Sequence, residues 1–244
     1  VRDNKSTLHI FCILSPGNIQ GSDEHMYGLV RFAKEQGIAK VVIHPILDGR
    51  DAIFNTGFGF VQTLQEKIQQ LGVGEIGSIA GRYYAMDRDH HWDRTEKAYQ
   101  VMTGGSAVRV AEEPLQAIQQ SYDQKIYDEE FVPTMIVRGG QPVGAIHSDD
   151  AVIFSNIRPD RARQITEAFV LPNFSGFNRT KLQNLFFCTM TEYEKDYPVT
   201  VAFPAEDVET SLAKVISDAG LKQLHIAETE KYAHVSFFLN GMLE

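Results

Sequence analysis

Residues 151–163 read AVIFSNIRPDRAR, an apolar run that passes directly into an arginine-rich segment of helical period. The run follows Asp149-Asp150 and has the length and bounds of a buried strand. Pro159 suits the first turn of a helix, where the missing N–H of proline costs nothing. Arg158, Arg161 and Arg163 therefore stand at a predicted strand-to-helix junction.

The spacing of these arginines separates them into two groups. If Pro159 is the first helical residue, Arg158 and Arg161 share one face and Arg163 points roughly the other way. A helix N-terminus already favours anions, so added cations indicate that something negative binds between them. The alternative is a solvated Arg/Asp helix start with salt bridges between residues three apart.

Two earlier apolar runs also lead into arginine-containing loops. Residues 40–47 predict a strand that ends at Asp48-Gly49-Arg50-Asp51, and residues 75–80 predict a strand that ends at a loop over 81–89. Ligands of open α/β sheets bind outside the carboxyl ends of the strands, so the three loops are expected to share one crevice. Its predicted lining consists of Arg50, Asp51, Arg82, Arg88, Arg158 and Arg161.

The side-chain types of this lining favour a small anionic ligand. The planar fork of donors on arginine matches carboxylate and phosphate groups, and a cluster of like charges is unfavourable unless an anion fills it. Asp51 should stay ionised among the arginines and could orient or deprotonate a substrate hydroxyl. The alternative for Asp51 is an ordinary salt bridge to Arg50 or another neighbour.

The rest of the pattern is βαβαβ with helical insertions, which predicts an α/β fold with a mainly parallel sheet and flanking helices. A further buried strand is expected at residues 8–14, ending at a turn over 15–18, and Ser22 is expected to cap a helix that Gly37 ends. Helices are also predicted near 60–71, 92–102 and 114–122, and strands at 133–137 and 141–146.

Composition narrows the class of protein. The 244 residues are 43% hydrophobic, enough for a substantial core, and the net charge of −9 argues against a nucleic-acid or anionic-membrane surface. Cys12 and Cys188 lie in apolar runs and are expected to be core residues. No apolar stretch is long enough for a membrane helix and no signal-peptide pattern is present, so a cytoplasmic enzyme is expected.

Other polar groups indicate structure more than chemistry. His90-His91 beside Asp87 and Asp89 resemble metal ligands, but adjacent residues rarely face one ion, and no metal ligand is predicted in this chain. His147 with Asp149-Asp150 reads as a turn before a strand. His9, His44 and His234 lie on strand-like runs and are expected to be satisfied or half-buried, and Tyr83-Tyr84 is expected to pack. There is neither a P-loop nor a G-x-G-x-x-G fingerprint.

Longer motifs carry a resemblance to a family. The stretches LSPGNIQGSDEH, LDGRD, GRYYAMDRD, SNIRPDRARQ, TMTEY and HIAETEKYAHV occur in this order and resemble the cofactor-independent phosphoglycerate mutases. The resemblance implies a glycolytic isomerase that interconverts 3-phosphoglycerate and 2-phosphoglycerate through a phosphoserine intermediate. It also implies a phosphotransferase domain that binds substrate and an alkaline-phosphatase-like domain with two divalent metals, commonly manganese.

The resemblance also assigns roles to residues. It implies substrate contacts by Arg50, Asp51, Arg82, Arg88, Arg158 and Arg161, and a contact of Lys231 with the transferred phosphoryl group. The first loop departs from the family motif S-D-G-G-V-H-S-H, because Gln20 stands where the family has a substrate-binding histidine. Asp51 and Lys231 are the expected catalytic groups and Gln20 an expected substrate ligand.

The resemblance further predicts how the chain is organised. Residues 1–190 are expected to form the phosphotransferase domain, and 191–244 part of the alkaline-phosphatase-like domain, with a strand at 198–203, a helix at 208–220 and a final strand in the region after 228 that runs to Glu244. The serine and metal sites are expected outside this chain, which would be an inactive central fragment of a monomeric enzyme. The alternative is a divergent, catalytically weakened relative that only binds a phosphorylated acid.

Overall fold

The protein is described by a computed structural model over residues 1–105, 109–204, 208–232 and 234–241. It contains two compact units, Val1–Phe203 and Pro204–Glu244. A domain boundary near residue 190 stays a prediction.

The larger unit is built on one sheet whose described strands run in the order β10-β9-β8-β1-β2-β4-β6-β5, with β3 beside β2 and β7 beside β6. β8, β1, β2 and β4 are parallel neighbours, and β6 turns the sheet antiparallel. The prediction of a mainly parallel α/β fold is therefore confirmed. The strands are β1 (Leu8–Leu14), β2 (Val41–Leu47), β3 (Glu75–Ile76), β4 (Ser78–Gly81), β5 (Arg109–Ala111), β6 (Thr134–Arg138), β7 (Gln141–Pro142), β8 (Ala151–Phe154), β9 (Phe186–Thr189) and β10 (Thr200–Val201).

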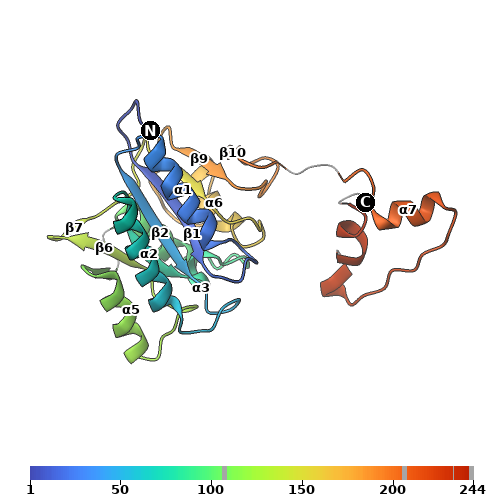
Figure 1. Ribbon diagram of the computed structural model, residues 1–244, viewed down its shortest axis with the longest axis horizontal. Coiled ribbons are helices and arrows are strands. Elements are labelled where there is room, and N and C mark those ends of the chain that lie inside the picture. Colours follow the sequence, from blue (N-terminus) through green and yellow to red (C-terminus); the bar gives the residue numbers. More distant parts are fainter. Residues whose placement is uncertain (106–108, 205–207, 233, 242–244) are drawn as a thin grey trace. The chain divides into compact units, whose positions relative to one another are not determined.

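Helices cover both faces of this sheet (Figure 1). Because strand side chains alternate, Ile10 and Cys12 of β1 pack against α1, α2 and α5, whereas Phe11 and Ile13 pack toward α4 and α6. Both faces are buried, which explains why β1 reads as a continuous apolar run. The helices are α1 (Asp23–Glu35), α2 (Gly57–Leu71), α3 (Arg82–Ala85), α4 (Trp92–Thr103), α5 (Pro114–Asp123) and α6 (Arg163–Val170).

The helix after β8 begins later than the sequence predicts. Pro159 starts a turn, in which the amides of Ala162 and Arg163 donate to the Pro159 carbonyl, and α6 begins only at Arg163. Arg158 and Arg161 therefore extend from a loop. The turn allows the Arg161 side chain to reach the carbonyl of Met86 on another segment.

Several predicted segments differ in length or detail from those in the structure. The strand expected at 141–146 is only Gln141–Pro142, and that expected at 198–203 is only Thr200–Val201. The strand expected at 75–80 is interrupted at Gly77, and the loop expected over 81–89 begins with the short helix α3. Ser22 precedes α1 as expected but makes no side-chain capping bond.

The smaller unit is helical where it is described. It contains α7 (Leu212–Asp218), shorter than the expected helix at 208–220, a 3₁₀-helix (Thr229–Lys231) and a π-helix (His234–Phe238). The final strand expected after residue 228 is wrong over this helical stretch, since the described part of the unit offers no strand to pair with; residues 242–244 lie outside the described residues. His234 is consequently exposed on a helix rather than half-buried on a strand.

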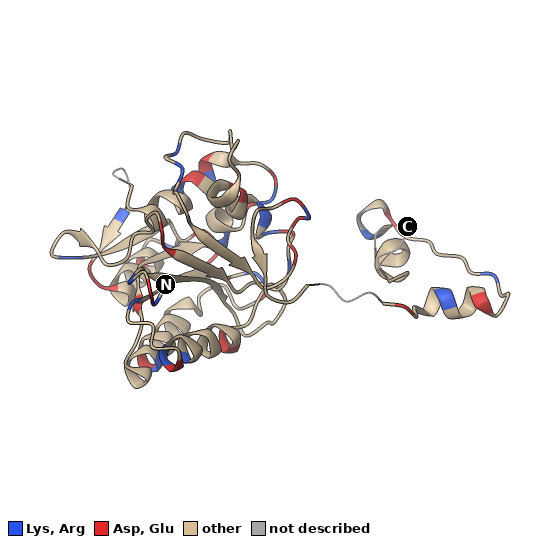
Figure 2. Cartoon of the chain, turned by 90° about the horizontal axis from the view of Figure 1, so that it is seen from above, with Lys and Arg blue, Asp and Glu red and all other residues tan. Residues whose placement is uncertain are grey.

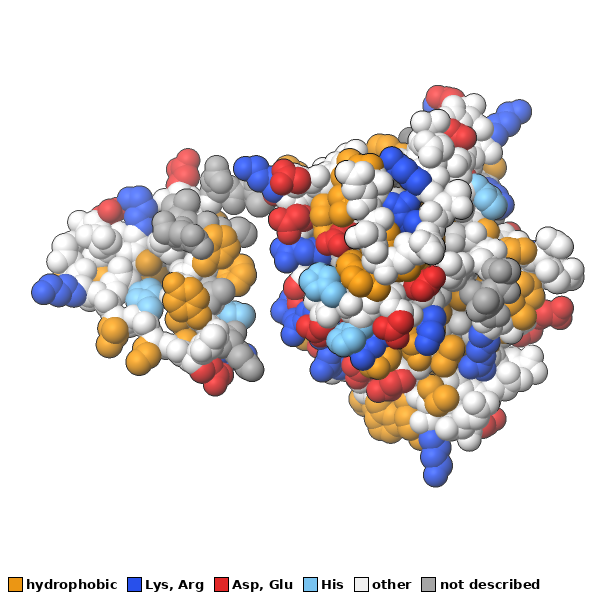
Figure 3. Space-filling model, turned by 180° about the vertical axis from the view of Figure 1, so that it is seen from behind, with side chains coloured by type: hydrophobic (Ala, Val, Ile, Leu, Met, Phe, Trp, Pro, Cys, Tyr) orange, Lys and Arg blue, Asp and Glu red, His pale blue; other side chains and the backbone are white. Residues whose placement is uncertain are grey.

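Charged residues lie mainly on helices and loops, and the central strands contain almost none (Figure 2). On the face of the larger unit seen in Figure 3, basic and acidic side chains are interspersed, without a continuous basic field. Within the described residues, no helix combines the length and apolar character needed to cross a membrane.

Candidate anion-binding site

The loops after β2 and β4 form a buried acid–base cluster. Arg82, which is 3% exposed, donates from Nη1 to Asp48 Oδ1 at 2.5 Å and to Asp51 Oδ2 at 2.7 Å. Burial acts to lower the pKa of Arg82, but the hydrogen bonds with Asp51 and Asp48 outweigh it and the pKa lies above its ordinary value. Arg82 therefore stays charged and fixes the Asp51 carboxylate at the carboxyl edge of the sheet.

The close approach of the backbone around Gly81 fixes where Arg82 emerges. A Cβ on Gly81 would lie 2.3 Å from the carbonyl oxygen of Glu129, so no larger residue fits between β4 and that segment. The Gly81 amide donates to the Phe131 carbonyl at 2.9 Å. The sequence places glycine at this position because the two backbones touch.

The loop after β8 meets the loop after α3. Arg88 Nη1 lies 2.8 Å from Asp160 Oδ2, and Arg158 Nε lies 2.8 Å from Asp160 Oδ1, the latter as an ion pair without hydrogen-bond geometry. Arg161 Nη1 donates to the Met86 carbonyl at 3.1 Å. One carboxylate thus holds two half-exposed arginines whose remaining donors are available to a ligand.

Electrostatics show that arginines from different loops converge. Burial lowers the pKa of the Arg161 guanidinium, and the positive charges of three other arginines lower it further: Arg88, Arg82 and Arg50. Those three residues follow β2 and β4, so the segments after these strands lie close enough for their charges to act on Arg161. The shared crevice stays a prediction. Excess positive charge of this kind is relieved when an anion binds.

Gln20 lies beside the Arg158 loop. Its carbonyl accepts hydrogen bonds from the amides of Ile157 at 2.8 Å and Arg158 at 3.3 Å. Its side chain is 4% exposed, and Oε1 has no hydrogen-bond partner within the described chain. The side chain that stands at the family's histidine position is therefore in place next to one of the arginine loops.

Several other buried polar atoms at the carboxyl ends of the strands also lack partners. Among the described residues they are Asp48 Oδ2 after β2, Arg82 Nε after β4, Ser155 Oγ after β8 and Thr189 Oγ1 at the end of β9. Unpaired buried polar groups each cost about 1–3 kcal/mol, so their concentration at one edge indicates a site completed by ligand or water. The edge offers donors and acceptors for an anion that also carries hydroxyl groups.

Two predicted residues take no part in the contacts described above. Arg50 is half-exposed and its Nε lies 3.4 Å from Glu129 Oε1, with its charge still felt at Arg161. Lys231 belongs to the smaller unit, at the end of the 3₁₀-helix, where it is exposed. Arg163 is bound elsewhere, because its Nε donates to the Tyr193 carbonyl at 2.5 Å and lies 3.3 Å from Glu194.

The Asp87, Asp89 and His91 side chains are the group of metal-type ligands that the described residues bring together, with ligand atoms within 4.8 Å of one another. The Asp87 carboxylate is already satisfied by amide donors and by Arg94 Nη1 at 3.1 Å. A guanidinium bonded to this carboxylate disfavours a cation beside it. These contacts fit a carboxylate that holds the loop together.

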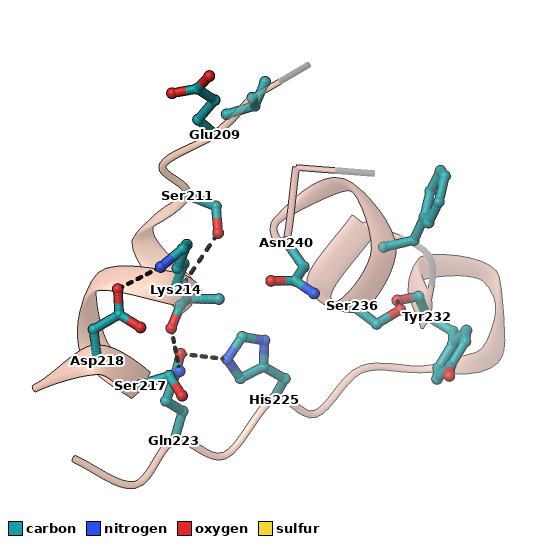
Figure 4. Close-up of a pocket in the computed structure, with 13 residues that line it drawn as sticks. Glu209, Ser211, Lys214, Ser217, Asp218, Gln223, His225, Tyr232, Ser236 and Asn240 are labelled. Carbon is teal, nitrogen blue, oxygen red and sulfur yellow. Dashed lines mark hydrogen bonds and ion pairs between the residues drawn. The ribbon is translucent and has the colours of Figure 1, made fainter. Parts of the chain in front are cut away.

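The smaller unit has a separate hollow of about 880 Å³, shown in Figure 4. Its polar lining is largely paired within the unit: Lys214 Nζ bonds Asp218 at 2.6 Å, Ser211 Oγ accepts from the Lys214 amide, and His225 contacts Gln223 at 3.1 Å. It lacks the convergence of arginines found in the larger unit.

Sequence reasoning missed the groups that hold the arginines. Asp48, Asp160 and Gln164 each connect different loops, and nothing in their local spacing reveals a partner more than seventy residues away, as for Arg88 with Asp160 and Asp87 with Gln164. The short motifs LDGRD and RPDRARQ contain all three residues, so the sequence marks these positions without revealing their role. Tyr83 was expected to pack but is 37% exposed, with the Arg94 guanidinium 3.9 Å from its ring centre.

A mainly parallel sheet flanked by helices, with arginines and a fixed carboxylate at its carboxyl edge, defines an α/β protein with a candidate anion-binding site. The chain belongs to the family described as "BPG-independent PGAM N-terminus", whose model matches residues 1–195. It is 46% identical over its whole length to proteins named 2,3-bisphosphoglycerate-independent phosphoglycerate mutase from Acetivibrio thermocellus and Clostridium acetobutylicum, and covers 48% of each.

A solved structure extends the likeness to three dimensions. The Leishmania mexicana phosphoglycerate mutase, crystallised at low cobalt concentration, matches 97% of this chain with a TM-score of 0.81 and 27% identity, and 45% of that chain is covered. The chain thus spans about half the length of the relatives that it matches. The alternative of a relative that only binds a phosphorylated acid is not favoured, because the likeness to named mutases runs through the whole chain.

Proposed function

We propose that the arginine-lined crevice binds 3-phosphoglycerate and 2-phosphoglycerate, and that the whole protein interconverts them as a glycolytic cofactor-independent phosphoglycerate mutase. The observation that carries the proposal is the pair of half-exposed arginines, Arg88 and Arg158, that the Asp160 carboxylate holds together. The charges of Arg88, Arg82 and Arg50, which lower the pKa of Arg161, support it. Phosphoglycerate supplies two anionic groups and a hydroxyl, which match such a site.

Each side chain has a distinct task in this proposal. The half-exposed Arg88 and Arg158 turn from Asp160 toward the phosphate or carboxylate, and Arg161, anchored on the Met86 carbonyl, supplies fixed charge. Asp51, held by Arg82, accepts a hydrogen bond or a proton from a substrate hydroxyl. Gln20 and Arg50 complete the substrate contacts.

The remaining expectations concern the whole protein. By resemblance, Lys231 contacts the transferred phosphoryl group, a serine carries it as a phosphoserine intermediate, and two divalent ions, commonly manganese, supply Lewis-acid chemistry. The Asp87 carboxylate, bonded to Arg94, does not fit as their ligand. We also propose that the enzyme acts as a monomer in the cytoplasm.

Calorimetric titration of the 244-residue chain with 3-phosphoglycerate tests the binding proposal. We expect a millimolar dissociation constant, equivalent to about 4 kcal/mol, because charge-assisted bonds in an open crevice are screened and their side chains must be ordered. Arg158→Ala and Arg161→Ala should each weaken binding several-fold. The same chain should show no turnover in an enolase-coupled assay.

Two controls make the titration specific. Arg163→Ala removes an arginine that bonds Tyr193 and Glu194, and Arg138→Ala removes an 80% exposed arginine paired with Glu75. Both variants should bind like the unmodified chain. An equal loss of affinity in all four variants would indicate a diffuse charge effect and would contradict the proposed site.

A further inference from the structure

We infer that Gln164 is a positioning residue that holds the Arg88 loop, residues 86–91, against the Arg158–Arg161 loop and so sets the geometry of the anion site. This inference rests on the proposed function of the crevice. Gln164 lies in the first turn of α6 and is 3% exposed, so it does not itself face a ligand.

Both the nitrogen and the oxygen of the Gln164 side-chain amide form hydrogen bonds to neighbouring segments. Nε2 donates to Asp87 Oδ2 at 2.9 Å and to Thr95 Oγ1 at 2.7 Å, and Oε1 accepts from the His90 amide at 2.9 Å. One buried side chain therefore connects α6 with the Arg88 loop on both sides of Arg88 and with α4.

The loop needs such support, because its backbone is strained. His90 has a φ of 59°, in the left-handed region that costs energy for a residue with a side chain. The side-chain Oε1 of Gln164 accepts a hydrogen bond from the backbone amide of His90. Asp87, oriented by Gln164, in turn accepts from the amides of Asp89 at 3.1 Å and His91 at 2.9 Å, which closes the turn around Arg88.

The ion pair of Arg88 itself with the Arg158–Arg161 loop cannot persist in the same way during binding. The Arg88–Asp160 ion pair is half-exposed and uses the guanidinium that the ligand must recruit. The Gln164 bonds are buried and compete with no ligand. They remain intact when the ion pair is exchanged for phosphate or carboxylate, so they preserve the position from which Arg88 reaches it.

The test is a double-mutant cycle in the full 244-residue chain, read by titration with 3-phosphoglycerate. Gln164→Leu keeps the volume but removes all three bonds and should raise the dissociation constant about tenfold. In an Arg88→Ala background the same change should alter the dissociation constant less than about twofold, because the residue acts through Arg88. Amide hydrogen exchange at His90 and His91 should accelerate in Gln164→Leu.

Two further variants separate positioning from general destabilisation. Thr166→Val removes a buried hydroxyl of the same helix that bonds only the Ala162 carbonyl, and should leave the dissociation constant within about twofold. Gln164→Asn is one methylene shorter, so it withdraws the amide while keeping a polar side chain; it tests the same loss if the leucine variant does not fold.

The outcomes distinguish this inference from the function on which it rests. If Arg88→Ala weakens binding but the Gln164 variants do not, or if they weaken it equally in both backgrounds, Gln164 is not a positioning residue for Arg88. If Arg88→Ala, Arg158→Ala and Arg161→Ala all leave binding unchanged, the proposed function itself fails.

Discussion

Gln20 is the residue at which this chain differs most clearly from the motif of its family. Its carbonyl anchors the Ile157–Arg158 backbone, and its buried Oε1 lacks a partner in the described chain. A glutamine amide offers a ligand a neutral donor at every pH, whereas a histidine beside an anion becomes a charged donor as the pH falls. Binding should therefore be weakened but not abolished by glutamine.

Gln20→His should tighten the binding of 3-phosphoglycerate by about 1 kcal/mol, or several-fold, because a charged bond replaces a neutral one. A bound anion raises the histidine pKa, so the gain should appear mainly at the lower pH. Calorimetric titrations at about pH 6 and pH 8, each compared with the unmodified chain at the same pH, measure it. Equal affinities with the same pH dependence would show that residue 20 does not face the ligand.

The sequence predicts a residue's role where that role follows from its own side chain and its place in the chain. The arginines were identified because three buried strands each lead into them, and the strand order β8-β1-β2-β4 then brings their loops to one edge. The residues that orient the arginines were not identified, because Asp160 and Gln164 act only through partners from another segment. Local spacing contains no information about such pairings.

At the scale of elements, a buried polar chain crosses strands β1, β2 and β4. His9 Nε2 lies 3.3 Å from Asp150 Oδ2, His9 Nδ1 lies 3.0 Å from His44 Nε2, and His44 Nδ1 lies 2.8 Å from Ser78 Oγ. With both rings neutral, one choice of tautomers satisfies every nitrogen. The prediction that these two histidines are satisfied within the sheet is confirmed.

This row of buried, hydrogen-bonded histidines makes the stability of the folded protein depend on pH. Burial lowers the pKa of His9 against the opposing bond to Asp150, and burial lowers the pKa of His44 further. The unfolded state therefore takes up protons first, and stability should fall as the pH drops below about 6.5, by up to about 1.4 kcal/mol per pH unit for each histidine.

Thermal unfolding of the chain between about pH 7 and pH 5 measures this dependence. His44→Gln removes one buried titrating ring and should flatten the slope, although stability at pH 7 falls because the ring fills the sheet interior. His25→Gln, which changes an exposed imidazole on α1, is the matched control and should keep the slope. An unchanged slope in His44→Gln would contradict the account of the buried pair.

At the scale of the whole molecule, the two units differ in how they are stabilised. The larger unit has apolar cores on both sides of its sheet. In the described part of the smaller unit no apolar side chain is buried, and Leu224 and Ile226 are 86% and 82% exposed. The sequence predicted the helix that contains α7 but not the 3₁₀- and π-helices after residue 228. The local pattern there resembles a strand, and the described part of the unit has no strand with which it could pair.

Truncation tests where the stable unit ends. A chain ending at Phe203 should keep the melting temperature of the full chain, because it retains Tyr193, which is 1% exposed and donates to the Asn156 carbonyl at 2.6 Å. A chain ending at residue 190 loses this ring and should be destabilised by at least about 3 kcal/mol. Thermal denaturation of the two chains decides between the boundaries, and equal stability would favour the earlier one.

The central claim is that arginines from separate loops bind one phosphorylated acid. The most direct measurement is an NMR titration of the unmodified chain with 3-phosphoglycerate, observing the Nε–Hε signals of its arginines. We expect signals of Arg88, Arg158 and Arg161 to shift along a common saturating curve, while those of Arg138 and Arg163 stay in place. Shifts that are equal for all arginines and never saturate, or no shift at the three crevice arginines, would contradict the account.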